Sequence, residues 1–166
     1  MNTGRILIIA VLGVLLGGID LQADNSFFRV LAAKPNATME DGVKMLYMLT
    51  TGESSTGKMT FQEICDILSR KGIIRKSYTK NKDRLLNRGQ VSYMLCKALG
   101  IKGGLTMRIF GVSERYGFRE CVYLKLVPPG TQWDRVTGGE LLGIMARAAD
   151  YQEKNKHRKS SDGRNR

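Results

Sequence analysis

Histidine is nearly absent from the sequence, and its absence removes several common kinds of catalytic centre. The 166 residues include one histidine, His157, which lies in a basic segment near the C-terminus. A Ser–His or Cys–His pair inside a folded domain needs a histidine there, and a multi-histidine metal site needs several. We therefore expect no catalytic centre, no metal site and no cofactor. A small cell-wall hydrolase stays open as an alternative, because paired carboxylates can come from positions far apart in a sequence.

Cysteine is also scarce, and the chain contains Cys65, Cys96 and Cys121. Their wide separation does not match the paired ligand spacing of a zinc site. In an oxidising compartment, two of them can form one disulfide and leave one thiol over. Each cysteine also occupies an apolar position of a predicted helix, and buried free cysteine is a common core residue. The pattern favours buried free thiols over a disulfide.

The apolar segment near the N-terminus is too short to cross a bilayer. It covers residues 6–19 and so has 14 residues, whereas a transmembrane helix needs about 20. Arg5 precedes this run, and residues 20–23 form a polar stretch that ends in Ala23. This arrangement is typical of a cleaved signal peptide over residues 1–23. We therefore expect an exported protein of the periplasm, cell wall or extracellular space that meets the membrane only transiently.

Acidic residues are few relative to basic ones. The chain has 27 lysines and arginines against 15 acidic residues, for a formal charge of +12. Residues 70–88, the basic loop, carry eight cations against Asp83, and residues 151–166 carry six cations against two acids. Such clustering indicates an anionic partner, such as an acidic polysaccharide or an anionic lipid surface, and export makes nucleic acid an unexpected one. Alternatively, both segments are solvated and only keep the protein soluble.

A helix-start motif recurs along the chain. Thr38, Asn87 and Thr137 each begin a predicted helix, and they lie 49 and 50 residues apart. Asn87 with Gln90, and Thr137 with Glu140, fit the capping box. In that motif the first side chain accepts a hydrogen bond from the N3 amide, and the N3 side chain accepts one from the cap amide. A fixed interval of this length is typical of a structural repeat.

Other helices are predicted between these caps. Thr60 begins another capping box. The helix that follows it has one apolar face and is predicted to end at Gly72. Residues 117–126 form a matching short helix, residues 26–33 a remnant first helix, and residues 105–110 a short strand or turn. We expect a mainly α fold, in which units of a short helix, a loop and a capped second helix pack as a small bundle.

The units resemble the S-layer homology domain, which has three tandem helix–loop–helix units of about this length. That family's second helix opens with a Thr-Arg-Ala-Glu-like motif, to which residues 87–90 (Asn-Arg-Gly-Gln) and 137–140 (Thr-Gly-Gly-Glu) are similar. Residues 93–100 are similar to its helix ending in Leu-Gly. The resemblance implies a domain over residues 24–150 that binds an anionic, often pyruvylated, cell-wall polysaccharide. Residues 151–166 would form a structureless basic tail.

The predicted ligand surface combines the basic loop with one aromatic residue. By resemblance, Arg88 is the motif arginine that would hold the anionic polysaccharide, and a guanidinium can bind a carboxylate in a bidentate manner. The candidate ligand-binding residues are Arg75, Lys76, Lys80, Lys82, Arg84, Arg88 and Trp133. Trp133 follows a Pro-Pro-Gly turn and could offer an exposed ring for sugar stacking, whereas we expect Phe118 and Tyr123 in the core. The alternative function is an extracytoplasmic protein-interaction module whose basic tail touches the membrane surface.

Overall fold

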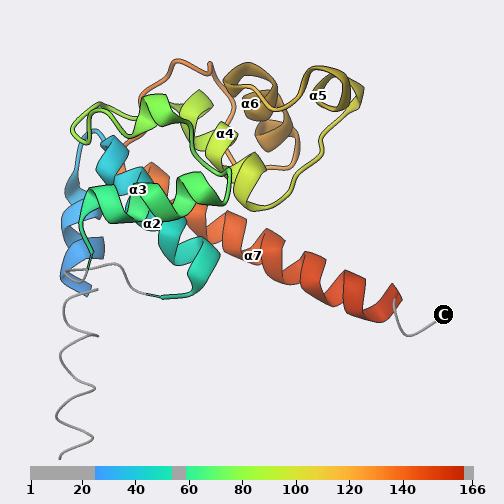
Figure 1. Ribbon diagram of the computed structural model, residues 1–166, viewed down its shortest axis with the longest axis horizontal. Coiled ribbons are helices and arrows are strands. Elements are labelled where there is room, and N and C mark those ends of the chain that lie inside the picture. Colours follow the sequence, from blue (N-terminus) through green and yellow to red (C-terminus); the bar gives the residue numbers. More distant parts are fainter. Residues whose placement is uncertain (1–24, 54–58, 163–166) are drawn as a thin grey trace, which may run out of the picture.

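The protein is a helical bundle, as the sequence predicts. The computed structural model describes residues 25–53 and 59–162, and within these ranges every regular element is a helix (Figure 1). The predicted signal peptide lies outside the described residues. None of the described helices is both long enough and apolar enough to cross a membrane.

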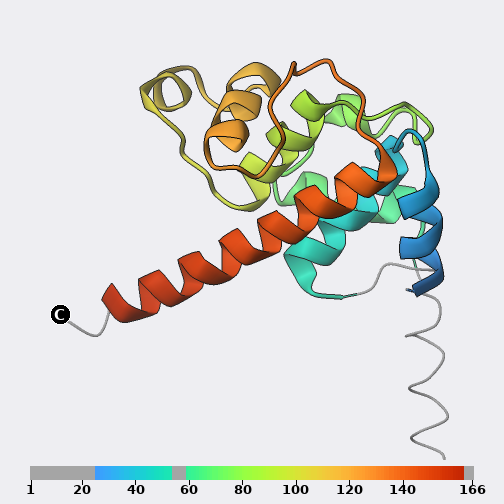
Figure 2. The same ribbon diagram turned by 180° about the vertical axis from the view of Figure 1, so that it is seen from behind.

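Short helices alternate with longer ones along the described chain. The elements are a helix over residues 25–33, α2 (Met39–Thr51), α3 (Phe61–Arg70), the 3-10 turn η1 (Lys76–Tyr78), α4 (Arg88–Ala98), α5 (Leu105–Phe110), α6 (Glu114–Tyr123) and α7 (Gly138–Asp162). The helix over residues 25–33 confirms the predicted first helix. In two opposite views α7 runs beside α2, and its C-terminal half extends beyond the other helices (Figures 1 and 2).

Capping boxes begin three of the helices where the sequence predicts them. Thr38 caps α2, Thr60 caps α3 and Asn87 caps α4, each with both hydrogen bonds in place. In the Asn87 box, Oδ1 accepts from the Gln90 amide at 2.8 Å and Gln90 Oε1 accepts from the Asn87 amide at 3.1 Å. These bonds satisfy amide groups that a helix cannot pair within itself, so each box fixes where its helix begins.

A closed ring of backbone hydrogen bonds joins the starts of α2, α4 and α7. Ala37, Leu86 and Val136 each directly precede the cap of one of these helices, and all three are fully buried. The Leu86 amide donates to the Ala37 carbonyl at 2.9 Å, and the Val136 amide donates to the Leu86 carbonyl at 3.1 Å. The Ala37 amide donates to the Val136 carbonyl at 2.7 Å and closes the ring. The three helices therefore begin at one common point.

The apolar core lies between the helices that start at this ring and the shorter ones outside them. α4 packs against α6, and α2 packs against α3, α4 and α7. The largest fully buried side chains include Tyr78, Leu46, Met94, Leu141 and Ile144. All three cysteines are buried and free, as the sequence pattern favours.

Two elements differ from the sequence prediction. Residues 105–110, predicted as a strand or turn, form the helix α5. The helix predicted over residues 117–126 is present as α6, but it begins and ends earlier. It begins earlier because Ser113 caps it, accepting from the Tyr116 amide at 3.1 Å. It ends before the proline turn because Lys125 takes a left-handed backbone conformation, with φ of 59°.

The basic C-terminal segment also differs, because α7 continues through it. The composition of the chain from residue 151 onward predicts no regular structure, yet α7 extends to Asp162. Residues 152–154 (Gln-Glu-Lys) are good helix formers, and adding residues to an existing helix costs far less than starting a new one. Tyr123, predicted in the core, is 79% exposed, whereas Phe118 is buried as expected.

Candidate functional site

The basic loop is held in place by contacts with two helices. The Met39 amide donates to the Arg84 carbonyl at 2.8 Å, and the Glu40 amide donates to the Lys82 carbonyl at 2.9 Å. Tyr78, buried within the loop, donates its hydroxyl to Glu114 Oε1 on α6 at 2.7 Å. Burial and this hydrogen bond raise the pKa of Tyr78, so the donor keeps its proton. The loop backbone therefore holds its lysines and arginines at fixed points.

The cations of the loop differ in how far they are engaged by the protein. Lys76, Lys80 and Arg84 are exposed. The Lys82 side chain is 55% exposed, with its Nζ 3.9 Å from the Glu40 carboxylate. Arg75 is more engaged, because its guanidinium carbon lies 4.0 Å from the centroid of the Tyr93 ring and its Nη1 lies 3.8 Å from Glu114. Lys76, Lys80, Lys82 and Arg84 are thus the predicted residues that present most of their charge to solvent.

The structure brings Trp133 next to the C-terminal end of the basic loop. The Arg88 amide donates to the Asp134 carbonyl at 3.0 Å, and the Gly89 amide donates to the Gln132 carbonyl at 2.8 Å. The segment that carries Trp133 is therefore paired with the first turn of α4. Arg135 Nη1 adds a hydrogen bond to the Leu85 carbonyl at 3.1 Å. Trp133 is 68% exposed, so an aromatic face and the cationic loop lie on adjoining segments of the surface.

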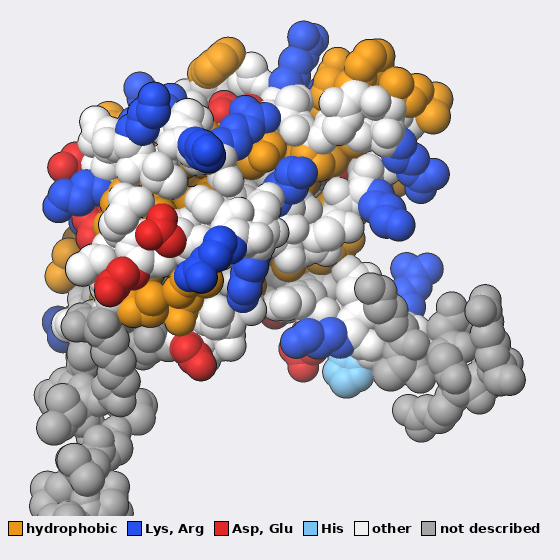
Figure 3. Space-filling model, viewed as in Figure 1, with side chains coloured by type: hydrophobic (Ala, Val, Ile, Leu, Met, Phe, Trp, Pro, Cys, Tyr) orange, Lys and Arg blue, Asp and Glu red, His pale blue; other side chains and the backbone are white. Residues whose placement is uncertain are grey.

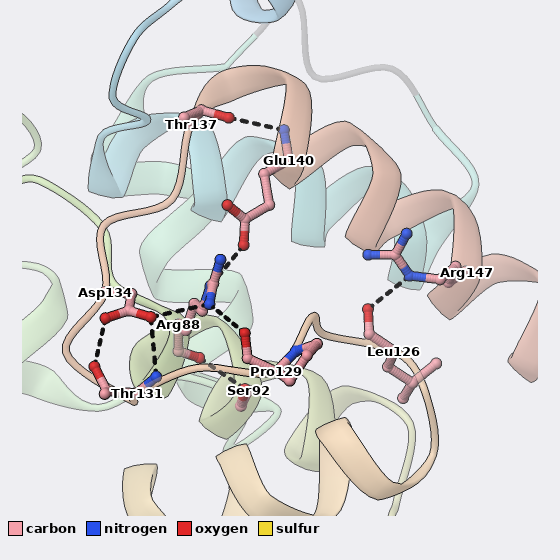
Figure 4. Close-up of polar contacts among 9 residues, drawn as sticks. All are labelled: Arg88, Ser92, Leu126, Pro129, Thr131, Asp134, Thr137, Glu140 and Arg147. Carbon is pink, nitrogen blue, oxygen red and sulfur yellow. Dashed lines mark hydrogen bonds and ion pairs between the residues drawn. The ribbon is translucent and has the colours of Figure 1, made fainter.

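Arg88 differs from the exposed cations because acceptors of the protein itself bind its guanidinium. Its Nε donates to Glu140 Oε1 at 2.7 Å, and its Nη1 donates to Asp134 Oδ2 at 3.0 Å and to the Pro129 carbonyl at 2.8 Å (Figure 4). The Arg88 side chain is 16% exposed. The predicted motif arginine thus ties the start of α4 to the start of α7 and to the segment before it.

Glu140 behaves differently from the capping residue that the sequence predicts. Its amide donates to Thr137 Oγ1 at 3.1 Å, which confirms half of the predicted capping box at the start of α7. Its carboxylate accepts from Arg88, whereas the capping-box pattern predicts that it accepts from the Thr137 amide. At α4 the corresponding residue is the uncharged Gln90, whose side chain accepts from the cap amide.

Asp134 is a member of this cluster that the sequence pattern does not predict. Its carboxylate accepts from both the hydroxyl and the amide of Thr131 as well as from Arg88. The hydrogen bonds from Thr131, with the charge of Arg88 as a smaller cause, lower the pKa of Asp134. The Thr-x-x-Asp spacing is a local signal of a turn, but nothing in it indicates a partner on α4.

Gly130 is required beside this cluster for two reasons. Its φ of 145° is one that other residues rarely adopt, and a Cβ there would collide with Arg88 Nη1 and Asp134 Oδ2. The turn before α7 and the Arg88 ion pairs therefore depend on each other.

The buried thiols are not activated nucleophiles. The sulfur atoms of Cys96 on α4 and Cys121 on α6 lie 3.7 Å apart. The hydrogen bond with Cys96 and burial raise the pKa of Cys121, and burial raises the pKa of Cys65 to about 11. A thiol needs to be a thiolate to attack, so neither site favours nucleophilic chemistry. No group of three or more potential metal ligands is present among the described residues.

Comparisons with protein-family models, with curated proteins and with solved structures gave no match to the chain.

Proposed function

We propose that this is an exported, non-catalytic protein that binds an anionic cell-wall or surface polysaccharide. The binding surface consists of Lys76, Lys80, Lys82 and Arg84 of the basic loop together with Trp133. The observation that supports this most directly is that Trp133, more than forty positions away in the sequence, lies beside the end of the basic loop.

Acidic polysaccharides match both halves of this surface. Their carboxylate or phosphate groups are attracted by a cluster of fixed cations, and their sugar rings have apolar faces that pack on exposed aromatic rings. Because the loop backbone is bonded to α2, binding does not have to order the loop first, and this preserves affinity. Two acids accompany this group of cations: Asp83 lies between Lys82 and Arg84 in the loop, and Glu40 forms an ion pair of 2.7 Å with Lys44.

Arg88 has a supporting role in this proposal. Nε and Nη1 already donate to Glu140, Asp134 and Pro129, so Arg88 can hold a ligand carboxylate in the bidentate manner only if the ligand displaces the protein's own acceptors. We infer that Arg88 fixes the segment that carries Trp133 against the start of α4. The exposed lysines and Arg84 then make the direct contacts with the ligand.

The resemblance to the S-layer homology domain agrees with this proposal. Three units built around Thr38, Asn87 and Thr137 would explain why the residues before these caps meet in one hydrogen-bonded ring. In this interpretation each unit joins two helices along the chain: the helix over residues 25–33 with α2, α3 with α4, and α6 with α7. In space the packing crosses between these units, because α3 packs against α2 and α6 packs against α4.

Retention of the full chain on immobilised alginate, with immobilised dextran as the uncharged control, tests the proposal. The test variant carries Lys76→Gln, Lys80→Gln and Arg84→Gln. The matched control carries Lys154→Gln, Lys156→Gln and Arg158→Gln, which removes the same charge from α7. We expect the test variant to bind alginate about a hundredfold more weakly and the control to lose much less, since each of the three cations near an anionic surface contributes on the order of 1 kcal/mol.

Two further measurements separate specific binding from general attraction. Trp133→Ala should weaken retention on alginate without changing the net charge, because it removes the stacking face. Retention should also fall as salt rises, since exposed charges are screened. Equal losses in the two charge variants, together with no effect of Trp133→Ala, would contradict the proposed surface.

A further inference from the structure

The short helix α5 exposes three of its four large apolar side chains to solvent. Leu105 is 73% exposed, Ile109 is 64% exposed and Phe110 is 73% exposed. Leu105 and Ile109 are four positions apart, so they share one face of the helix. Met107 on another face is buried, and it attaches α5 to the bundle. An amphipathic helix on a protein in water normally has the opposite arrangement.

Cations surround this apolar tip. Residues 97–119 contain five basic residues against one acid, Glu114. The five are all exposed, and they are Lys97, Lys102, Arg108, Arg115 and Arg119. Glu114 is engaged by the Tyr78 hydroxyl, and Glu120, the next acid along α6, accepts from the Gly104 amide at 3.3 Å. Figure 3 shows hydrophobic side chains gathered over α5, with Lys and Arg side chains beside them.

A hollow opens between α5 and the C-terminal end of α4. Its volume is about 740 Å³. Its walls combine apolar side chains, among them Ile101, Met107 and Val112, with three cations. The cations are Lys97, Lys102 and Arg108, and no acidic residue lines it.

We propose that α5 is a membrane-contact element, which inserts Leu105, Ile109 and Phe110 into the surface of a bilayer that contains anionic phospholipid. The hollow beside it receives phosphate headgroups through Lys97, Lys102 and Arg108. An interfacial element of this kind combines apolar side chains that enter the headgroup region with cations that meet anionic lipid. This surface is separate from the basic loop and Trp133, so the proposal does not depend on polysaccharide binding.

The observations favour a membrane over a protein partner. Three protruding side chains offer far less area than the roughly 1,200 Å² that a stable interface buries. A second copy of this chain would bring its own five cations against these, and like charges facing each other oppose association. A bilayer needs no cavity shaped to these three side chains. Its anionic headgroups can contact the surrounding cations however the protein is rotated about the membrane normal.

A fluorescent reporter at α5 tests the proposal in the full chain. Trp133 is the one tryptophan of the sequence, so Trp133→Phe with Phe110→Trp leaves a single indole at the tip of α5. The protein is mixed with vesicles of brominated phosphatidylcholine, with or without phosphatidylglycerol. We expect bromine quenching and a blue shift of emission on the anionic vesicles, because bromine on the acyl chains quenches only an indole that has entered the bilayer. The unaltered chain, with Trp133 as its reporter, should show neither change.

Variants of the reporter protein separate the contributions of the apolar tip and the cations. Leu105→Ser with Ile109→Ser should abolish quenching. Lys97→Gln with Lys102→Gln and Arg108→Gln should lower vesicle affinity by about a hundredfold. The matched control is Lys154→Gln with Lys156→Gln and Arg158→Gln on α7, which should change quenching little. Unchanged far-ultraviolet circular dichroism verifies that each variant is folded.

The proposal is overturned by either of two results. The first is a reporter at position 110 that stays unquenched by bromine and open to aqueous iodide in the presence of anionic vesicles; α5 would then be left as a contact for a protein. The second is equal quenching on neutral and anionic vesicles, or equal losses in the two charge variants, since the surrounding cations would then have no part in binding.

Discussion

Replacing Arg88 by alanine tests whether this side chain stabilises the fold. The substitution removes three hydrogen bonds, from Nε to Glu140 and from Nη1 to Asp134 and to the Pro129 carbonyl. It leaves the carboxylate of Glu140, whose side chain is 17% exposed, without its guanidinium partner. It also removes the side-chain bonds between the first turn of α4 and the segment before α7, which are then joined by backbone hydrogen bonds from the amides of residue 88 and Gly89. A residue that only binds ligand would show none of these effects.

The expected magnitude follows from how far each partner is buried. A hydrogen bond to a charged group contributes about 1.5–3 kcal/mol when it is shielded, and an exposed ion pair contributes about 0–1 kcal/mol. The Glu140 bond is shielded, whereas the Asp134 side chain is 40% exposed and its share is small. We therefore expect Arg88→Ala to lower the free energy of unfolding by about 2–4 kcal/mol. In a chain of this size that corresponds to a fall in Tm of about 5–15 °C.

Urea and thermal denaturation, followed by circular dichroism of the helices, measure this change. Arg84→Ala is the control, because it removes an exposed cation of the same loop whose contact with α2 is made by its backbone carbonyl. A double-mutant cycle of Arg88→Ala and Glu140→Ala should give a coupling of about 1–3 kcal/mol. The reasoning is refuted if Arg88→Ala is as stable as Arg84→Ala, or if the coupling with Glu140 is near zero.

Two further predictions concern close packing and thiol chemistry. Gly138→Ala should lower the free energy of unfolding by about 1–3 kcal/mol in urea, because its Cβ would collide with the Leu31 carbonyl oxygen. Gly139→Ala is its control, with a Cβ at 3.7 Å from the nearest atom, and equal stability of the two variants would contradict the steric explanation. Cys65 and Cys121 should react far more slowly with iodoacetamide in the native protein than in urea, since their raised pKa values leave little thiolate near neutral pH. The native rate should rise as pH increases toward 11, and a native rate equal to that in urea would argue against burial of these thiols.

The starts of the helices could be predicted from the sequence because capping is a local interaction. Thr38, Thr60 and Asn87 make their hydrogen bonds with residues three positions ahead, so spacing alone identifies them. The burial of the cysteines could be predicted for a similar reason, because apolar residues repeat with the helical period around each of them.

Interactions between distant segments could not be predicted in the same way. Arg88 lies 46 positions from Asp134 and 52 from Glu140, and nothing in the local pattern shows that these carboxylates would engage it. The adjoining positions of Trp133 and the basic loop depend on the same long-range pairing. The helix over residues 105–110 has a different cause: only Met107 of its apolar side chains is buried, so the pattern that identifies a buried helix face is missing.

The ring of Ala37, Leu86 and Val136 sets a condition on the order in which this chain can fold. Two of its three hydrogen bonds involve Val136, which lies about a hundred residues after Ala37. A growing chain that has been released only as far as α6 therefore has α2 and α4 but cannot close the ring. Contacts between such distant residues slow folding, because the chain loses the entropy of closing a long loop before the hydrogen bonds can form and offset that loss. The start of α7 is thus needed to complete the ring that begins before α2, so the joined starts of α2, α4 and α7 can form only once the chain as far as Val136 is available.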